Sequence, residues 1–166
     1  MREGNPWFIS CSMSDMVGIE NKNVLLIGGG SGMGQASALA LAESGAQVAI
    51  AGRRMEMLRE TADKFGNGNE ILCKDADVTD RDSLEHLFQW FDHSVGKLDI
   101  LIHAAGINVA MRSMQELDPK DWDRLIEINL TGSYNVLRLT LDRMRTQKNG
   151  LVILINSVAG RRSVPL

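Results

Sequence analysis

Short apolar runs alternate with longer segments of helical periodicity along most of the chain. A run such as Val24-Leu-Leu-Ile27 predicts a strand that is buried on both faces. The segments between the runs carry apolar residues at the spacing of helices that pack on a sheet. The predicted strands are Val24–Ile27, Gln47–Ala51, Glu70–Lys74, Leu98–His103 and Leu151–Asn156, and the predicted helices are Met33–Ser44, Met55–Phe65, Arg81–Val95 and Pro119–Arg145.

This alternation predicts an α/β fold with a doubly wound parallel sheet. About five strands are predicted, whereas a complete fold of this kind has about six, in the order 3-2-1-4-5-6. We therefore expect C-terminal strands and helices to be missing from this sequence. Residues 1–20 show no periodicity and are expected to form a flexible N-terminal arm, while residues 21–166 form a single, incomplete domain.

Residues at the predicted helix ends agree with these boundaries. Asp118-Pro119 is typical of a helix start, Asp80 or Thr79 can cap the third helix, and Gly45 follows the first. The fourth helix contains weak helix formers at its middle, residues 129–132. Two interpretations stay open: a tolerated imperfection, or a kink that has a functional role.

Composition excludes several classes of function. The net charge of −3 gives no basic field for nucleic acid, and no apolar run approaches the roughly 18 residues of a membrane span. Cys11 and Cys73 form neither a disulfide framework nor a metal-binding spacing, so we expect two reduced thiols in a cytoplasmic protein. His86 and His93 are interpreted as packing or surface residues of the third helix rather than metal ligands.

A glycine-rich turn joins the first strand to the first helix. Such a turn lets backbone N–H groups at a helix N-terminus approach a phosphate, because no Cβ intervenes. The chain is therefore predicted to bind a dinucleotide. Ser31 could bond a phosphate or simply form the turn. The candidate binding residues of this turn are Gly28, Gly30, Ser31, Gly32, Met33 and Gly34.

The end of the second strand bears on which cofactor is bound. Sites for NAD place a carboxylate about 20 residues beyond the glycine turn, where it bonds the ribose 2′-hydroxyl. This chain has Arg53 and Arg54 instead, and a guanidinium can bind a 2′-phosphate with paired hydrogen bonds. NADP is therefore predicted, with NAD the less favoured cofactor. Alternatively, one of the two arginines only extends into solvent.

From Val24 to Gly160 the sequence resembles the short-chain dehydrogenase/reductase family, which has an NAD(P)-binding Rossmann fold. Gly28-x-x-x-Gly32-x-Gly34 matches the nucleotide loop of that family. Asp77-Val78 resembles the pair that holds the adenine, and Ala104-Ala105-Gly106 stands where Asn-Ala-Gly is common. His103-Ala104 replaces a usual Asn-Asn, which removes two amides that normally brace the central strand.

The resemblance also implies catalytic residues. Asn129 resembles the Asn that holds a water in a proton relay, and Ser157 resembles the Ser that bonds the substrate carbonyl oxygen. The family's Tyr-x-x-x-Lys motif would lie beyond Leu166, and Tyr134 is followed by Asn-Val-Leu-Arg. The implied activity is hydride transfer between the nicotinamide and a small carbonyl or alcohol substrate. We expect this chain alone to be inactive.

Two alternatives remain. The chain could be a non-catalytic NADP-binding protein, either a truncated paralogue or a sensor. It could also be an S-adenosylmethionine methyltransferase, although Gly52-Arg53 lacks the carboxylate that such sites generally place at the second strand. A homo-oligomer is expected as well, because the strand Leu151–Asn156 would be an unpaired edge beside an uncovered side of the fourth helix.

Overall fold

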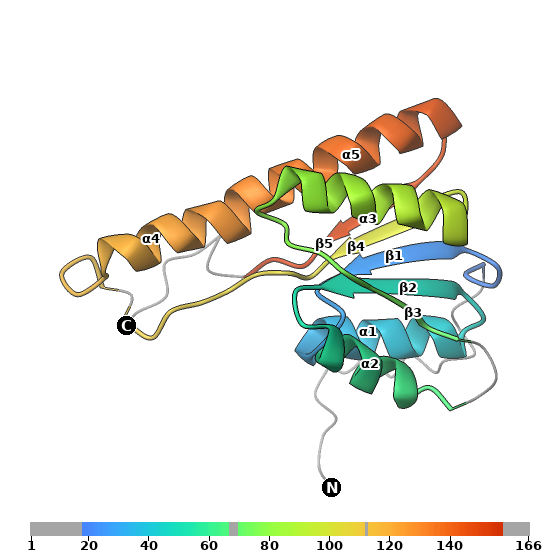
Figure 1. The fold of residues 1–166 in the computed structure, drawn as a ribbon, viewed down its shortest axis with the longest axis horizontal. Coiled ribbons are helices and arrows are strands. Elements are labelled where there is room, and N and C mark those ends of the chain that lie inside the picture. Colours follow the sequence, from blue (N-terminus) through green and yellow to red (C-terminus); the bar gives the residue numbers. More distant parts are fainter. Residues whose placement is uncertain (1–17, 67–69, 112, 158–166) are drawn as a thin grey trace, which may run out of the picture.

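A computed structural model describes residues 18–66, 70–111 and 113–157. Five parallel strands form one sheet in the order β3-β2-β1-β4-β5 (Figure 1). This arrangement confirms the predicted doubly wound parallel sheet. The predicted N-terminal arm falls mostly outside the described residues. The strands are β1 (Asn23–Ile27), β2 (Gln47–Gly52), β3 (Leu72–Asp75), β4 (Ile100–His103) and β5 (Leu151–Leu154).

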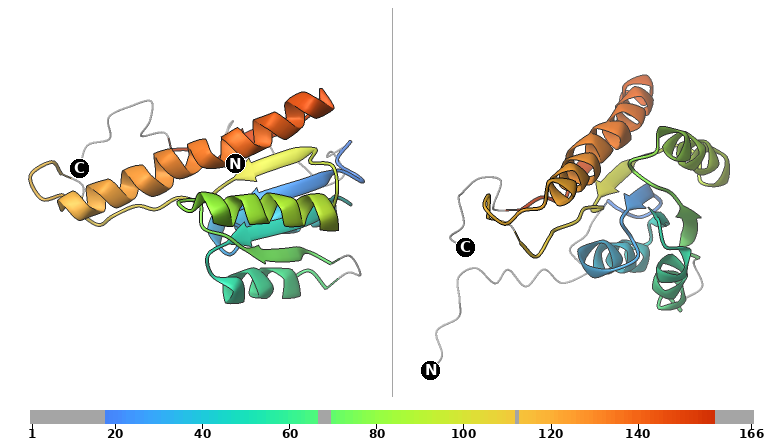
Figure 2. Two further views of the ribbon diagram at one scale, coloured as in Figure 1. Left: turned by 45° about the horizontal axis from the view of Figure 1, so that its top comes forward. Right: turned by 60° about the vertical axis from the view of Figure 1, so that its left-hand side comes forward.

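Helices cover both faces of the sheet (Figures 1 and 2). The helices α1 and α2 lie on one face, and α3 and α5 lie on the other. The helix α4 continues beyond the end of the sheet and buries none of its residues. The bounds are α1 (Gly32–Glu43), α2 (Met55–Asp63), α3 (Arg81–Ser94), α4 (Pro119–Leu125), the π-helix η2 (Ile126–Thr131) and α5 (Gly132–Gln147).

The central strand β1 shows why its sequence is apolar at successive positions. Val24 and Leu26 pack into the core on the side of α1, whereas Leu25 and Ile27 pack into the core on the side of α3 and α5. All four side chains are fully buried. Because alternate side chains point to opposite faces, a strand covered on both sides has no polar positions to spare.

The prediction of one continuous α-helix over Pro119–Arg145 is wrong at its middle. Residues Ile126–Thr131 form a π-helix, and the Gly132 N–H donates to the Glu127 carbonyl five residues earlier. A π turn accommodates one extra residue and occurs mostly as a single-turn bulge inside an α-helix. The weak helix formers of this segment therefore mark a real change of helical register.

The ends of several elements follow the expected chemistry. The Asp80 side chain accepts from the amides of Asp82 and Ser83, and Asp118 caps α4 before Pro119. The strand β3 starts two residues later than predicted, and β5 ends at Leu154, two residues earlier. Cys73 is a free thiol, and Cys11 lies outside the described residues. None of the described helices is long and apolar enough to cross a membrane.

Candidate functional site

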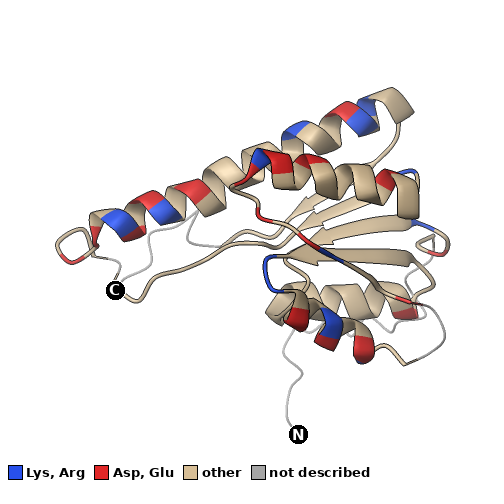
Figure 3. Ribbon diagram, in the orientation of Figure 1, with Lys and Arg blue, Asp and Glu red and all other residues tan. Residues whose placement is uncertain are grey.

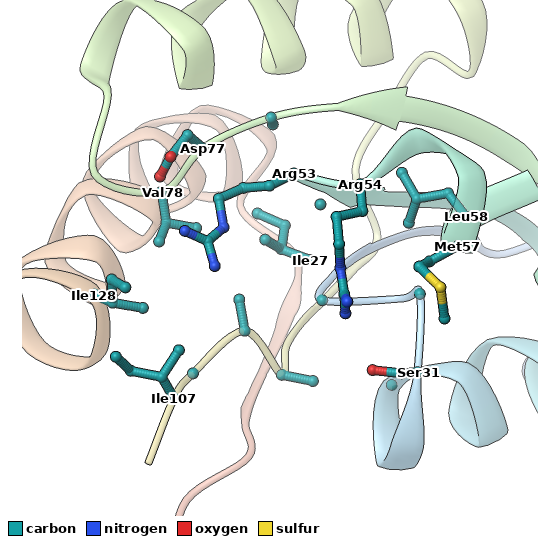
Figure 4. Close-up of a pocket in the computed structure, with 18 of the residues that line it drawn as sticks. Ile27, Ser31, Arg53, Arg54, Met57, Leu58, Asp77, Val78, Ile107 and Ile128 are labelled. Atoms are coloured by element: carbon teal, nitrogen blue, oxygen red, sulfur yellow. The ribbon is translucent and has the colours of Figure 1, made fainter. Parts of the chain in front are cut away.

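A pocket lies at the carboxyl ends of the strands, where parallel α/β sheets bind their ligands (Figure 4). Its walls come from the loops that follow β1, β2, β3 and β4, together with η2. Most of the predicted cofactor residues meet there. These are Gly28, Gly30, Ser31, Met33, Gly34, Arg53, Arg54, Asp77, Val78, Ala104, Ala105 and Gly106.

The glycine turn packs directly against the loop after β4. Gly28 has a φ of +96°, and a Cβ there would lie 2.5 Å from the Ala105 nitrogen. A Cβ on Gly34 would clash with the Gly28 carbonyl oxygen. These two glycines therefore allow the first turn of α1 and the loop after β4 to close on the same pocket.

The N-terminus of α1 faces this pocket with its backbone N–H groups available. Ser31 is the N-cap residue in an extended conformation, and its hydroxyl makes no capping hydrogen bond. The first turn of α1 also contains no acidic residue. Unpaired N–H groups and the helix dipole favour an anion at such a position, so a phosphate group fits here.

Arg53 and Arg54 supply positive charge at the end of β2. Both side chains are exposed, and both extend into the pocket in Figure 4. Neither guanidinium pairs with a carboxylate in the part of the chain that the structure describes. Figure 3 shows the same loop, between β2 and α2, as a basic segment. Two free guanidinium groups beside a helix N-terminus can bind a second phosphate.

The loop after β3 is held rigidly by its own side chains and by α5. The Asp77 carboxylate accepts from the Thr79 amide at 2.9 Å and from the Thr79 hydroxyl at 2.8 Å. The Val78 carbonyl accepts from the buried Asn135 amide at 3.2 Å. A Cβ on Gly132 would lie 2.6 Å from a Val78 methyl, so the helix packs closely on this loop. This wall of the pocket is therefore preorganised.

Asn129 in η2 binds the backbone of the loop after β4. Its side-chain oxygen accepts from the Ile107 amide at 2.8 Å, and its side-chain nitrogen donates to the Ile107 carbonyl at 3.0 Å. Ile107 and Ile128 line the pocket (Figure 4). The side chain of Asn129 thus positions a pocket wall, while its backbone belongs to the π turn.

Gly32 and Ser157 lie outside the set of pocket-lining residues. Gly32 is the first residue of α1 and has a φ of +55°. Ser157 is exposed and follows β5, whose Leu154 pairs with His103 of β4. Because β4 and β5 are parallel, Ser157 lies at the same edge of the sheet as the pocket.

His103 is buried, with 3% of its surface exposed, and its Nε2 lies 3.1 Å from the Ser133 hydroxyl oxygen. Burial lowers the pKa of His103 below its usual value of 6.5, so the ring is neutral at physiological pH. The imidazole thus contacts α5 at Ser133.

Several lining residues were not predicted from the sequence. Met57 and Leu58 come from the first turn of α2, which packs against the glycine turn at Gly30. Their positions in the sequence could have indicated them, because both lie in the first helical turn after Arg54. No local signal indicates Ile128, because its place depends on the packing of η2. The unpredicted lining residues are Ile27, Gly52, Met57, Leu58, Ala76 and Ile128.

The sheet order and the pocket define a doubly wound nucleotide-binding domain. A family model described as short chain dehydrogenase matches residues 22–166. The chain belongs to this family, whose members bind NAD or NADP and act as oxidoreductases. The predicted family is thereby confirmed.

Individual relatives agree with this assignment. An uncharacterized oxidoreductase of Listeria monocytogenes, Lmo0432, is 34% identical over 89% of this chain and 59% of its own length. A short-chain type dehydrogenase/reductase from Mycobacterium marinum is 30% identical with a TM-score of 0.86, over 94% of this chain and 64% of that one. The NAD+-bound xylitol dehydrogenase is 30% identical with a TM-score of 0.85, over 89% and 57%. The chain thus spans less than two thirds of each relative.

Proposed function

We propose that this chain is the cofactor-binding portion of an NADP-dependent oxidoreductase. In this proposal the first turn of α1 receives the pyrophosphate, and Arg53 and Arg54 receive the 2′-phosphate of the adenosine ribose. The observation that carries the preference for NADP is the pair of exposed arginines at the end of β2, where a site for NAD needs a carboxylate.

Arg53→Ala and Arg54→Ala test this preference separately. Hydrogen bonds to a charged group contribute about 1.5–3 kcal/mol, so the variant that loses the contact should bind NADPH at least about tenfold more weakly. Its affinity for NADH, which has no 2′-phosphate, should not change. The matched control is Arg59→Ala, which removes an exposed arginine of α2 that does not line this pocket.

Isothermal titration of the three variants with NADPH and NADH gives the outcome. If neither Arg53→Ala nor Arg54→Ala affects NADPH more than Arg59→Ala does, the arginines do not select NADP. If NADPH does not bind the unmodified chain, the assignment of the pocket itself is wrong.

We propose further that the reaction is hydride transfer to a small carbonyl substrate or from an alcohol, with Ser157 bonding the substrate oxygen and Asn129 in the proton relay. The sequence has one tyrosine, Tyr134, which lies in α5. The lysine of a Tyr-x-x-x-Lys motif would stand four residues later, where this chain has Arg138. We therefore expect the 166-residue chain alone to bind NADPH with negligible turnover. NADPH oxidation with a panel of aldehydes and ketones measures this directly, and robust oxidation would contradict it.

A non-catalytic NADP-binding protein is the second candidate, and the position of Tyr134 is the observation that favours it. The two candidates share the cofactor and differ in the proton donor. They are separated by reading the DNA directly after the codon for Leu166. A Tyr-x-x-x-Lys sequence encoded there in any frame supports the oxidoreductase, whereas its absence supports the non-catalytic protein.

A further inference from the structure

Three hydrogen-bonded steps connect β4 to the wall of the pocket through η2. His103 Nε2 lies 3.1 Å from Ser133 Oγ, and Ser133 Oγ donates to the Asn129 carbonyl at 2.7 Å. Asn129 then binds both the amide and the carbonyl of Ile107. Thus His103, which directly precedes the loop after β4, is linked through Ser133 and Asn129 to the backbone of Ile107 in that same loop.

The protons in this chain of bonds can be assigned. A serine hydroxyl has one proton, and the Asn129 carbonyl can only accept, so the Ser133 proton lies between Ser133 and Asn129. The Ser133 oxygen must then accept from His103, which requires a proton on Nε2. A neutral imidazole has one N–H, so Nδ1 carries a lone pair. Nδ1 is buried and makes no hydrogen bond within the described part of the chain, which agrees with a neutral ring.

We propose that His103 is a positioning residue for the cofactor pocket. As the Nε2–H tautomer it orients the Ser133 hydroxyl onto the Asn129 carbonyl, and this bond holds the π turn so that the Asn129 side chain meets the Ile107 peptide. The inference rests on the proposed function, because it treats the pocket lined by Ile107 as the cofactor site.

The geometry suits this role for two reasons. The Ser133 hydroxyl adds a side-chain hydrogen bond to the backbone of the π turn, at the carbonyl of Asn129. A serine hydroxyl otherwise rotates freely among its acceptors, so a fixed donor on its oxygen restricts it to one orientation. His103 is rigid because it lies in a strand paired on both sides, with Ile27 of β1 and Leu154 of β5.

His103→Phe and His103→Gln separate hydrogen bonding from packing. Phenylalanine fills the buried volume without a donor, whereas glutamine keeps an N–H at about the reach of Nε2. In the full 166-residue chain we expect His103→Phe to speed hydrogen exchange of the Ile107 amide and to weaken NADPH binding about fivefold, which corresponds to one lost hydrogen bond. His103→Gln should restore both values to within about twofold of the unmodified chain. His93→Phe, at an exposed position of α3, is the control.

The tautomer is measured independently by long-range ¹H–¹⁵N correlation spectra of the histidine rings, in which we expect Nε2 to be protonated. A proton on Nδ1, or a His103→Phe variant with unchanged Ile107 exchange, would overturn the inference. If His103→Phe does not fold, Ser133→Ala provides the same test on exchange, because it removes the next link. If the unmodified chain does not bind NADPH, the proposed function fails, while exchange and tautomer still decide the role of His103.

Discussion

Gly28 combines a left-handed backbone with close approach to a second loop. Its φ of +96° already disfavours any side chain, and the Ala105 nitrogen lies 2.5 Å from where a Cβ would be placed. Gly96 has nearly the same φ, +99°, but nothing lies within 4 Å of its Cβ position. A substitution at Gly96 therefore measures the cost of the left-handed backbone alone, whereas a substitution at Gly28 adds the cost of the clash with the loop after β4.

Gly96→Ala should lower the free energy of unfolding by about 1–2 kcal/mol, the cost of a left-handed alanine. Gly28→Ala should lower it by at least about 3 kcal/mol, because backbone atoms must also move. Urea unfolding measures both. Equal losses in the two variants would show that the loop after β4 does not pack on Gly28.

We expect His103 to make the free energy of unfolding depend on pH. Burial lowers its pKa in the folded state below the value of 6.5 that applies when the chain is unfolded. The unfolded state therefore binds the proton first, and stability that is complete above pH 6.5 is lost as the pH falls through the folded-state pKa. The loss approaches about 1.4 kcal/mol per pH unit within this window.

Urea unfolding at pH 7.5 and pH 5.5 tests this dependence. The decrease in stability between the two pH values should be smaller in His103→Gln than in the unmodified chain. His93→Gln, which changes an exposed histidine, should keep the full decrease. A His103→Gln variant with the same decrease as the unmodified chain would exclude His103 as its source.

At the scale of the elements, η2 and the first turn of α5 hold two walls of the pocket. Asn129 bonds to Ile107 after β4, and Asn135 at the start of α5 bonds to Val78 after β3. The change of register between these residues sets which side chains face which loop. Successive residues of an α-helix are rotated by about 100° about its axis. Removing the extra residue of the π turn would therefore turn the side chains of α5 by about 100° relative to those of α4.

Asn129→Ala should lower the free energy of unfolding by about 2 kcal/mol, because two hydrogen bonds to Ile107 are lost at about 1 kcal/mol each. Asn108→Ala is a matched control in the partner loop. Among the described residues its side chain bonds to the neighbouring Val109 amide alone, so a change of less than about 0.5 kcal/mol is expected. If Asn129→Ala lowers the free energy of unfolding by no more than Asn108→Ala does, the two hydrogen bonds between Asn129 and Ile107 do not contribute to stability.

The comparison with the sequence has a physical explanation at this scale. The strands, the glycine turn and the arginines after β2 were predictable because periodicity and turn chemistry are local properties. The weak formers at residues 129–132 indicated a disturbance, but its form depends on Ile107, which is 22 residues away in sequence. The place of Ile128 in the pocket and the bond between His103 and Ser133 also depend on contacts that are distant in sequence. Both form only when η2 and α5 pack on the sheet.

At the scale of the whole molecule, β5 is an exposed edge strand. Within residues 18–66, 70–111 and 113–157 it pairs with β4 alone, and several of its apolar side chains are about half exposed. Exposed fractions are 52% for Leu151, 38% for Ile153 and 45% for Leu154. An apolar edge with free backbone groups favours pairing with another chain, so we propose that the purified chain self-associates.

Ile153→Lys should reduce this association, because a lysine on an edge strand opposes edge-to-edge pairing. Gln89→Lys, which adds the same charge at an exposed position of α3, is the control and should leave association unchanged. Sedimentation velocity over a range of protein concentrations distinguishes the variants. An unmodified chain that stays monomeric at high concentration would contradict the proposal.

The central claim is that the pocket between the glycine turn and the arginines after β2 binds NADP in preference to NAD. Its most direct test is a pair of calorimetric titrations of the unmodified 166-residue chain, one with NADPH and one with NADH, at the same ionic strength. Tighter binding of NADPH, by at least about tenfold, is the predicted result, because the proposal assigns the guanidinium groups to the 2′-phosphate, which NADH lacks. Equal affinity, or tighter binding of NADH, would contradict the claim.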